Sequence, residues 1–509
     1  MIATLRTFIL KRIPLIALLI IYLIFTLVTY RDFGLTMDEF FVYTRGQYFY
    51  NKVVGNDAYL QKGFAIHEEG NEDILYNNSS YPALLYAINN NQTYELYHLI
   101  NMLIAFLIFI LTYEMLLSAT KNPRFAIIGP LFLFLTPRFL GHIPANPKDI
   151  PLAVSYFAVL AMIFLSRKWD IKLQLVMLGI LVGLSASVRI IGFTLIPVYV
   201  LYRLLYPLKF DVRNLLKQAI HIVLESVIIF LIAFLVFMVN MPYVATDPIN
   251  HLIELLRVSA QYPWYGDILF FGKTISFDQR PVWYLPVWIL ITTPLFILGL
   301  SMYGVIKKMN KPMTAIKMLI LLSIGVHALF YLFLKPIIYN GLRHYLFLLP
   351  HIVLLATLGY IQLIKNKKLH IGMYITTGIF IVAILVNYWK LHPYEYTYFN
   401  TIKEILPKEL QGFELDYWAG SDKEAMEWLS NYFDKHHISN VSVYSCSKSA
   451  SLSYYMPQVV DVNTNIQKAD YIVCYDKKDL SFVQEHIKKS ILHEIKRGDV
   501  VYSTIFKVD

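Results

Sequence analysis

Eleven strongly apolar segments recur along this 509-residue chain and limit the architectures that it can adopt. A helix that crosses the roughly 30 Å hydrocarbon core of a bilayer needs about 20 mostly apolar residues. We therefore expect an α-helical polytopic membrane protein with about 11 transmembrane helices. The expected spans lie near residues 13–30, 97–118, 125–137, 152–165, 173–188, 191–206, 218–240, 284–305, 318–334, 346–364 and 370–389.

Some of these segments are short for a crossing. The segments at 125–137 and 152–165 must extend into their flanks or end within the protein. The first segment is not followed by a small-residue cleavage site, so it is predicted to be a retained span and not a signal peptide.

The composition agrees with this class of protein. Only 16% of the residues are charged and the mean hydropathy is +0.51, whereas soluble domains are about one quarter charged. The net charge of +10 does not indicate a nucleic-acid partner, because the basic residues form short clusters between apolar segments. Nucleotide-binding glycine motifs and zinc motifs are absent from the sequence. The cofactor is therefore unknown; a divalent cation is compatible with the sequence, but no metal ligands are predicted.

The distribution of Lys and Arg predicts the orientation. Cytoplasmic connections are enriched in these residues, and the N-terminus and every second connection carry basic clusters, for example Lys307, Lys308 and Lys365. We expect a cytoplasmic N-terminus and an extracytoplasmic C-terminus, in a bacterial inner (plasma) membrane. The outer connections then include residues 31–96, 138–151, 241–283 and 335–345.

Two domains are expected. Residues 1–389 form the transmembrane catalytic module, and residues 390–509, whose composition is that of a soluble domain, form a small extracytoplasmic α/β domain. Helical spacing at 423–433 and strand-like segments at 441–446, 469–476 and 500–508 support this interpretation. Cys446 and Cys474 fall in two of these strands; one disulfide is compatible with that placement, but two buried thiols are the favoured interpretation.

Adjacent acids follow the first span. Asp38 and Glu39 stand at the expected outer boundary, before an aromatic helical segment. One interpretation is a helix start, with Thr36 or Asp38 as the N-cap. The other interpretation is catalysis, because capping accounts for one acid and not for two among aromatic residues.

The segment TPRFLGHIPANPKDIP, residues 136–151, gathers polar groups beside the membrane. Its prolines prevent a regular helix and fix the backbone. A rigid solvated turn is one interpretation, and a site for a charged headgroup is the other. The candidate residues are Arg138, His142, Asn146 and Lys148 for substrate binding and Asp149 for catalysis.

Three further candidates lie at span ends. Arg189 is surrounded by apolar residues, where a charge marks a functional site, an internal ion pair or a snorkelling side chain. Arg343 and His344 precede the span at 346–364; Arg343 could bind phosphate with two donors or anchor the span at the interface. All three are predicted to bind substrate.

The segment GFELDYWAGSDKEAMEWL, residues 412–429, opens the outer domain. Asp416, Tyr417 and Trp418 are predicted to dock this domain onto the membrane module. Ser421 is predicted to cap the following helix, with Glu424 at the spacing of a capping box.

These motifs resemble a known family. The acidic DE pair after the first span, PRFLGHIPANPKDIP, NGLRHYLFLLP and FELDYWAGSDKEAMEWL are similar to segments of the protein O-mannosyltransferase and lipid A aminoarabinose transferase group (glycosyltransferase family 39-like, with the GT-C fold). The resemblance covers most of the chain. One departure is NNSSYPALLYAI, which stands where many relatives carry a His-Pro-Pro sequence.

The resemblance implies a membrane glycosyltransferase, hexosyl or pentosyl, that uses a polyprenyl-phosphate sugar donor at the outer face. The acceptor would be a protein, lipid or glycan hydroxyl, and neither nucleic acid nor a nucleotide site is implied. In this interpretation Asp38 accepts the acceptor proton during an inverting single displacement, with Asp149 as the alternative base. Arg189 and Arg343 neutralise the donor phosphate.

Two other classes fit part of the pattern. A transporter or flippase of lipid-linked sugars would more often show inverted repeats and charges near the bilayer midplane, and neither is evident in the sequence. A lipid-linked glycan polymerase or ligase shares the type of substrate, but usually has one large outer loop in place of a long soluble tail.

Overall fold

The computed structural model describes residue 6 and residues 8–55, 80–89, 93–206, 215–260, 266–447, 449–462, 465–475, 483, 485 and 487–509. The expected outer connections 31–96 and 241–283 therefore lie partly outside the described residues. The start of the NNSSYPALLYAI segment lies outside them as well.

Helices occupy all of the expected spans. Among the described residues, five helices are long and apolar enough to cross a membrane: α6 (Tyr94–Ile104) with α7 (Phe106–Thr120), α12 (Ile171–Val188), α14 (Leu215–Asn240), α19 (Lys311–Leu334) and α21 (His370–Leu391). A sixth crossing is formed if α17 (Tyr284–Thr292) and α18 (Leu295–Ile306), which meet at an angle of 115°, count as one span. The length and composition of these helices identify a membrane protein.

The remaining expected spans coincide with shorter apolar helices. These are α2 (Ile13–Thr29), α8 (Pro123–Ala126) with α9 (Ile128–Phe134), α11 (Asp149–Leu165), η3 (Ile190–Thr194) with α13 (Leu195–Leu205), and α20 (Leu348–Ile364). Each apolar segment is thus helical, but the number of complete crossings stays a prediction.

The helices pack around α20, which is almost entirely buried. It crosses α18 at two glycines. A Cβ on Gly359 would lie 2.3 Å from the Leu300 carbonyl oxygen, and a Cβ on Gly304 would lie 2.1 Å from the Leu355 carbonyl oxygen. Small residues of this kind let two backbones approach closely inside a membrane. In contrast, α21 buries only Phe380 and Ile384, so most of its apolar surface is available to lipid.

The outer connections contain their own elements. These are α3 (Met37–Val53), α5 (Ser80–Ile88), α10 (Pro137–His142), α15 (Pro242–Thr246), α16 (Pro248–Ala260), β1 (Asp267–Phe270), β2 (Lys273–Ser276), η4 (Phe277–Gln279) and η5 (Arg343–Tyr345). The antiparallel β1–β2 hairpin is attached to the tail, because the Gly272 amide donates to the Gly412 carbonyl oxygen over 2.8 Å.

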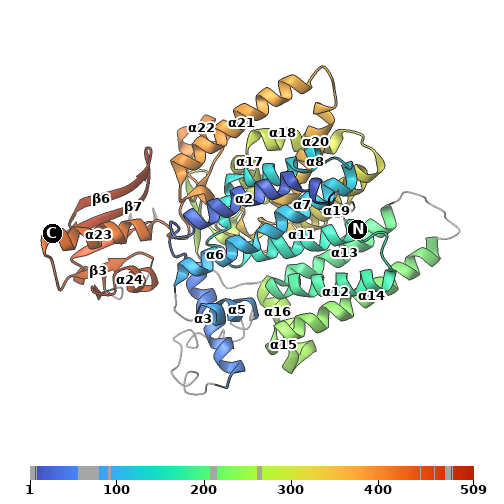
Figure 1. The fold of residues 1–509 in the computed structure, drawn as a ribbon. Coiled ribbons are helices and arrows are strands. Elements are labelled where there is room, and N and C mark those ends of the chain that lie inside the picture. Colours follow the sequence, from blue (N-terminus) through green and yellow to red (C-terminus); the bar gives the residue numbers. More distant parts are fainter. Residues whose placement is uncertain are drawn as a thin grey trace.

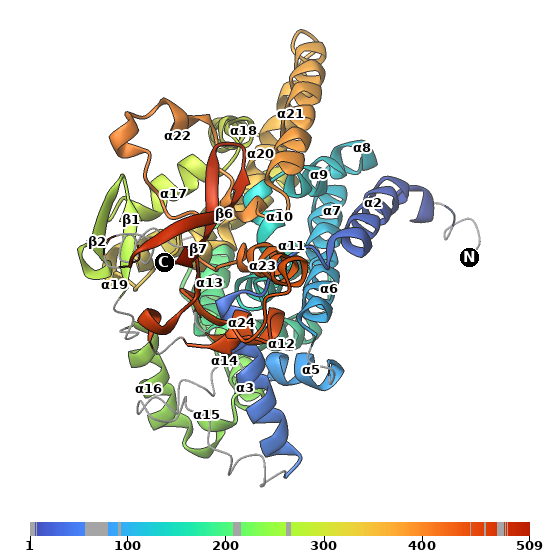
Figure 2. The same ribbon diagram turned by 90° about the vertical axis from the view of Figure 1, so that its left-hand side faces the viewer.

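The C-terminal sheet domain lies at one end of the helical body, on the left in Figure 1 and toward the viewer in Figure 2. Its five strands follow the order β4-β3-β5-β7-β6, with β3 parallel to β4 and β5, and β7 antiparallel to β5 and β6. The elements of the tail are η6 (Glu395–Thr397), α22 (Thr401–Ile405), η7 (Lys408–Leu410), α23 (Asp422–His436), β3 (Ser442–Ser445), α24 (Ser449–Tyr455), β4 (Val460–Asp461), η8 (Ile466–Lys468), β5 (Tyr471–Cys474), β6 (Lys489–Arg497) and β7 (Val500–Val508).

The small α/β domain expected from the sequence is confirmed, with its helix and three strands in the expected places. The core of the domain joins Leu429 and Phe433 of α23 to Val443, Val473 and Ile505 of the sheet. The boundary is not sharp, because the tail first contributes to the helical core through its residues 398–413.

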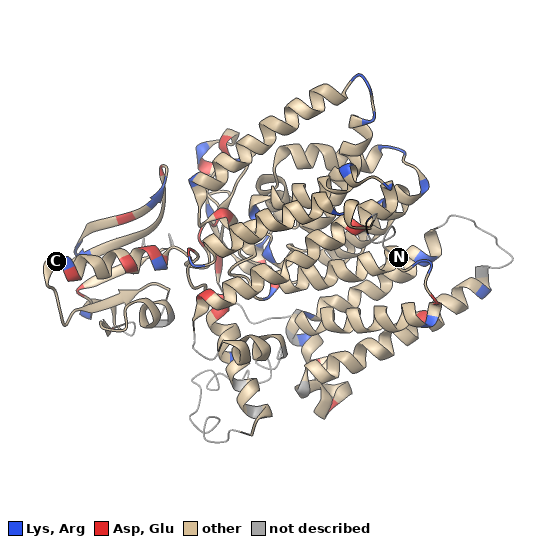
Figure 3. Ribbon diagram, in the orientation of Figure 1, with Lys and Arg blue, Asp and Glu red and all other residues tan. Residues whose placement is uncertain are grey.

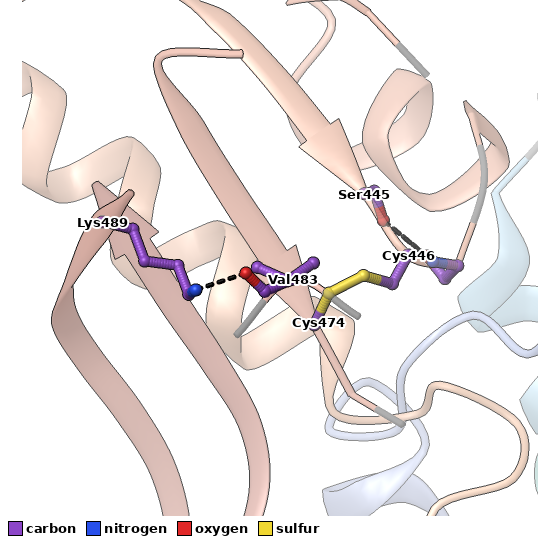
Figure 4. Close-up of a disulfide and its surroundings, with 6 residues drawn as sticks. Ser445, Cys446, Cys474, Val483 and Lys489 are labelled. Atoms are coloured by element: carbon purple, nitrogen blue, oxygen red, sulfur yellow. Dashed lines mark hydrogen bonds between the residues drawn. A yellow bond between two sulfur atoms is a disulfide. The ribbon is translucent and has the colours of Figure 1, made fainter. Parts of the chain in front are cut away.

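The two cysteines are joined, which corrects the expectation of two buried thiols. Cys446 and Cys474 form a disulfide with a Cα–Cα distance of 4.9 Å (Figure 4). Cys446 follows β3 and Cys474 ends the adjacent parallel strand β5, so the pairing of these strands brings the two side chains together. A disulfide is typical of an oxidising compartment, which agrees with the predicted outer location of this domain.

We expect the disulfide to contribute measurably to the stability of the domain. Its closed loop spans 28 residues, for which the chain-entropy relation gives about 3–4 kcal/mol. The variant with Cys446→Ser and Cys474→Ser should therefore unfold at a lower temperature. In the unreduced parent protein neither thiol should react with a maleimide in denaturant, and reaction of both would contradict the bond.

The charged residues are distributed unevenly (Figure 3). The helical body is almost free of charge along its length, and several loops at its end away from the sheet domain carry Lys and Arg. Acidic and basic residues meet where the helices adjoin the sheet domain. This distribution agrees with the predicted orientation.

Candidate active site

The first turn of α3 sets the position of the acidic pair. Thr36 and Glu39 form a capping box: the Glu39 amide donates to Thr36 Oγ1 over 3.3 Å, and the Thr36 amide donates to Glu39 Oε2 over 2.9 Å. Thr36 Oγ1 also donates to the Ala145 carbonyl oxygen over 3.0 Å, which attaches α3 to the 138–151 segment. The cap is therefore Thr36, and Asp38 is left for another role.

Asp38 lies between two cations. Its Oδ2 accepts a hydrogen bond from Arg343 Nη1, and its Oδ1 is 3.5 Å from Lys148 Nζ. The Arg343 and Asp38 side chains are both nearly buried. Burial opposes ionisation, but Arg343, Lys148 and Arg189 together hold the pKa of Asp38 below its usual range. Asp38 is therefore a carboxylate, and its two neighbours are available to a second anion.

Asp149 forms the other half of the site. Its Oδ1 is 2.7 Å from Arg189 Nη2, and its Oδ2 accepts from Asn146 Nδ2 over 3.0 Å. The Asp149 amide donates to Asn146 Oδ1 over 2.9 Å. Arg189 is thus an internal ion-pair partner, as one interpretation of the sequence proposed. Two carboxylates, each held by arginine, lie at neighbouring positions in the same buried region.

Two histidines complete this region as neutral groups. Burial, with Arg138 and Arg343, lowers the pKa of His142 well below its ordinary value. His142 contacts Asn146 Nδ2 through Nδ1 at 3.1 Å and Tyr417 Oη through Nε2 at 3.1 Å. Burial, with Arg343 and Arg189, lowers the pKa of His344 in the same way.

Glu39 and Arg138 lie beside this region and make further contacts of their own. Glu39 Oε1 lies 2.9 Å from His98 Nε2 on α6, in addition to its part in the cap. Arg138 Nη2 donates to the Tyr398 carbonyl oxygen over 3.2 Å, and its guanidinium lies over the Phe399 ring at 5.2 Å. Both side chains are buried, and the catalytic role of Glu39 and the substrate-binding role of Arg138 stay predictions.

The backbone at α10 is unusually close to the tail. A Cβ on Gly141 would lie 2.1 Å from the Tyr396 amide nitrogen, so only glycine allows η6 to pack on α10. The indole of Trp418 contacts His142 at 4.8 Å between ring centroids and lies 5.7 Å from the Arg343 guanidinium carbon. The predicted docking role of Tyr417 and Trp418 is confirmed. Asp416 instead accepts hydrogen bonds from Tyr396 Oη and from the Gly420 and Ser421 amides, all within the tail.

Tyr417 and Trp418 also border the candidate site, which the sequence analysis did not assign to them. The sequence feature that could have identified them is the presence of two adjacent aromatic residues where the soluble tail contacts the membrane module. The predicted side-chain cap at Ser421 is wrong. Ser421 stands at the N-cap position, but its Oγ donates to Asp416 Oδ2 over 2.6 Å, and Glu424 instead pairs with Arg497 at 2.7 Å.

No group of three or more His, Cys, Asp or Glu side chains within the described ranges could hold a metal ion. The arrangement of side chains is suited to general acid–base catalysis and to electrostatic stabilisation of an anion. It contains carboxylates that could accept a proton and cations that could hold a phosphate.

The structure was compared with known proteins. No protein-family model matches the chain, and no curated protein sequence matches it. Among solved structures, ArnT from Cupriavidus metallidurans bound to undecaprenyl phosphate is similar, with a TM-score of 0.52, 12% identity and coverage of 96% of this chain and 98% of that one. The apo structure of the same protein gives a TM-score of 0.50, 11% identity and coverage of 96% and 97%.

At this level of identity the likeness concerns the fold. It extends over nearly the whole of both chains. The expectation drawn from the sequence motifs is confirmed: this chain has the GT-C fold, with a small C-terminal α/β domain.

Proposed function

We propose that the protein is a membrane glycosyltransferase that moves a sugar from a polyprenyl-phosphate donor to an acceptor hydroxyl at the outer face. The observation that supports this proposal is the contact of one carboxylate, Asp38, with two cations, Arg343 and Lys148. A donor phosphate needs such cations as its bond to the sugar breaks. The ArnT structure with undecaprenyl phosphate supports the same class of donor.

The reaction is a single displacement. The acceptor oxygen attacks the anomeric carbon, the bond from that carbon to the phosphate oxygen breaks, and the configuration inverts. The acceptor proton passes to Asp38, and Arg343 with Lys148 holds the phosphate that leaves. Asp149, paired with Arg189, is the alternative base or a partner for sugar hydroxyls.

The pKa of Asp38 is low when no donor phosphate is bound to the site. A bound phosphate competes for Arg343 and Lys148, so the carboxylate loses part of the stabilisation that keeps it ionised. Donor binding therefore makes Asp38 a better proton acceptor at the moment when a base is required.

A reconstituted assay tests the proposal. Purified protein in liposomes with a polyprenyl-phosphate sugar and a membrane extract as acceptor should release free polyprenyl phosphate. A flippase would move the donor between leaflets and leave it intact, so translocation without release would overturn the proposal.

The titration of Lys148 gives a prediction on donor affinity. Burial lowers the pKa of Lys148 to about 8, although Asp38 opposes the shift. The ammonium is thus mostly charged at pH 7 and mostly neutral at pH 9. The affinity for undecaprenyl phosphate should fall about tenfold over this range, since one charge-assisted contact is lost. The Lys148→Arg variant should lack this fall, and an equal fall in both proteins would contradict the role.

The orientation is tested by thiol labelling. With the native disulfide intact, a single cysteine at Gly55 or Asp499 should react with an impermeant maleimide from outside intact cells. One at Asn366, in a basic connection, should react only after permeabilisation. All three positions are exposed. If Gly55→Cys and Asp499→Cys react from opposite sides, the predicted topology is wrong.

A further inference from the structure

Two aromatic rings contact the guanidinium of Arg343, the proposed phosphate-binding cation. The guanidinium carbon lies 4.9 Å from the centroid of the Tyr339 ring and 5.7 Å from that of the Trp418 ring. Tyr339 precedes Arg343 in the same connection, whereas Trp418 belongs to the tail. Arg343 is 3% exposed and Trp418 is 1% exposed, so water hardly competes for this contact. A cation over an aromatic face is held more strongly when both groups are desolvated.

The aromatic contacts leave the hydrogen-bond donors of Arg343 available. The N–H groups of a guanidinium point outward in its plane, whereas an aromatic ring attracts the cation through the ring face. Nη1 donates to Asp38 Oδ2, and Nε is buried without a hydrogen-bond partner among the described residues. The two rings therefore fix the guanidinium without occupying donors, which suits a cation that has to bind a phosphate.

The turn that carries Trp418 has a fixed shape. The Asp416 carboxylate accepts from the Gly420 and Ser421 amides, each over 2.9 Å, and from Ser421 Oγ over 2.6 Å. Ala419, inside this turn, has a φ of +58°. This left-handed conformation is costly for a residue with a Cβ and persists only where the surrounding contacts hold it. The hydrogen bonds to Asp416 supply those contacts, so the position of the indole is well defined.

The same turn contacts the start of α3, the helix of the proposed base. The Met37 amide donates to the Trp418 carbonyl oxygen over 3.4 Å, and Met37 directly precedes Asp38. A Cβ on Gly34 would lie 2.2 Å from the Gly420 carbonyl oxygen, so the two backbones are in close contact. Trp418 thus contacts the cation through its ring and the segment of the carboxylate through its backbone.

We propose that Trp418 is a positioning residue for the transfer reaction, through which the sheet domain fixes the guanidinium of Arg343 beside Asp38. This role rests on the proposed function, which assigns the leaving phosphate to Arg343. Without the indole, the long arginine side chain keeps its charge but gains rotational freedom. Its donors then lose their alignment with the phosphate, and a small misplacement of this kind slows a reaction strongly. The sheet domain is therefore part of the active site.

The test is a double-mutant cycle on the release of polyprenyl phosphate. Trp418→Leu should lower turnover about tenfold, and Trp418→Phe, which keeps an aromatic face, about threefold. Arg343→Ala should lower it roughly a hundredfold. Because Trp418 acts through Arg343, the protein with both Trp418→Leu and Arg343→Ala should lose little more than Arg343→Ala alone. Independent effects would multiply to about a thousandfold and overturn the proposal.

Trp428→Leu is the matched control. Trp428 lies on α23 of the same domain, and its ring stacks on those of Tyr432 and His493, both within the domain. Its turnover should stay near that of the parent. If Trp428→Leu loses as much as Trp418→Leu, the loss reflects the stability of the domain and the positioning role is wrong.

The thermal unfolding temperatures of the four proteins in the cycle give a second measurement that needs no substrate. The shift caused by Trp418→Leu should be smaller when Arg343→Ala is already present, since the contact between the two side chains is then absent. A parent that releases no polyprenyl phosphate would contradict the proposed function. The contact is then judged from the unfolding temperatures, and additive shifts would disprove it.

Discussion

Asp38→Asn should reduce turnover by about 10²–10⁴-fold, the usual loss when a general base is removed. The amide keeps the shape of the side chain but cannot accept the acceptor proton. Because Arg343 and Lys148 lose their negative partner, donor phosphate should bind at least as tightly as in the parent. The expected result is thus a protein that holds undecaprenyl phosphate and hardly turns over, measured by lipid binding and phosphate release.

Two variants separate this role from structural ones. Thr36→Ala removes the observed cap, which should cost about 1 kcal/mol of stability and preserve most of the turnover. Asp149→Asn removes the other carboxylate. If Asp149→Asn abolishes turnover and Asp38→Asn does not, Asp149 is the base and Asp38 only positions Arg343.

Arg343→Ala should lower turnover by roughly a hundredfold, corresponding to about 2–4 kcal/mol of transition-state stabilisation. Its guanidinium contacts Asp38 from a nearly buried position, where a lost charge is not replaced by water. Arg343→Lys keeps the charge but loses the two-donor geometry and should recover only part of the rate. Steady-state release of polyprenyl phosphate measures both variants.

Arg497→Ala provides the control for Arg343. Arg497 belongs to the sheet domain and pairs with Glu424 at 2.7 Å, so its loss removes an arginine that is not assigned to the proposed phosphate. Its turnover should stay near that of the parent. An Arg343→Ala protein that folds and keeps full turnover would rule out contact with the leaving group.

Local signals in the sequence identified the spans and most of the polar candidates. Membrane helices are recognisable because the requirement for about 20 apolar residues applies segment by segment. The same kind of reasoning found α23, β3, β5 and β7. It missed β6, Lys489–Arg497, because this edge strand pairs on one side only and most of its residues are partly buried, so buried and exposed positions do not alternate clearly.

Pairings between distant residues could not be predicted in this way. Asp38 and Arg343 are 305 positions apart, and no spacing rule connects them. The capping box predicted at Ser421 does not form because of a partner that the spacing rule ignores: Ser421 Oγ donates to Asp416. The disulfide between Cys446 and Cys474 could not be predicted for the same reason. The parallel pairing of β3 and β5 brings the two cysteines together, and the sequence around each cysteine does not show this pairing.

The neutral histidines around Asp38 have a consequence for the order of steps. With His142 and His344 uncharged, the cations Arg343, Lys148 and Arg189 exceed the carboxylates Asp38 and Asp149 by one positive charge. The proposed donor, a polyprenyl-phosphate sugar, is a phosphodiester with one negative charge, which would balance the net charge of these five residues. The product is a phosphomonoester with a second ionisation near pH 6, and its extra charge is balanced only while Asp38 retains the proton it has accepted. In the proposed reaction we therefore expect departure of the lipid phosphate to be coupled to departure of that proton, so that the site returns to its starting charge when both have left.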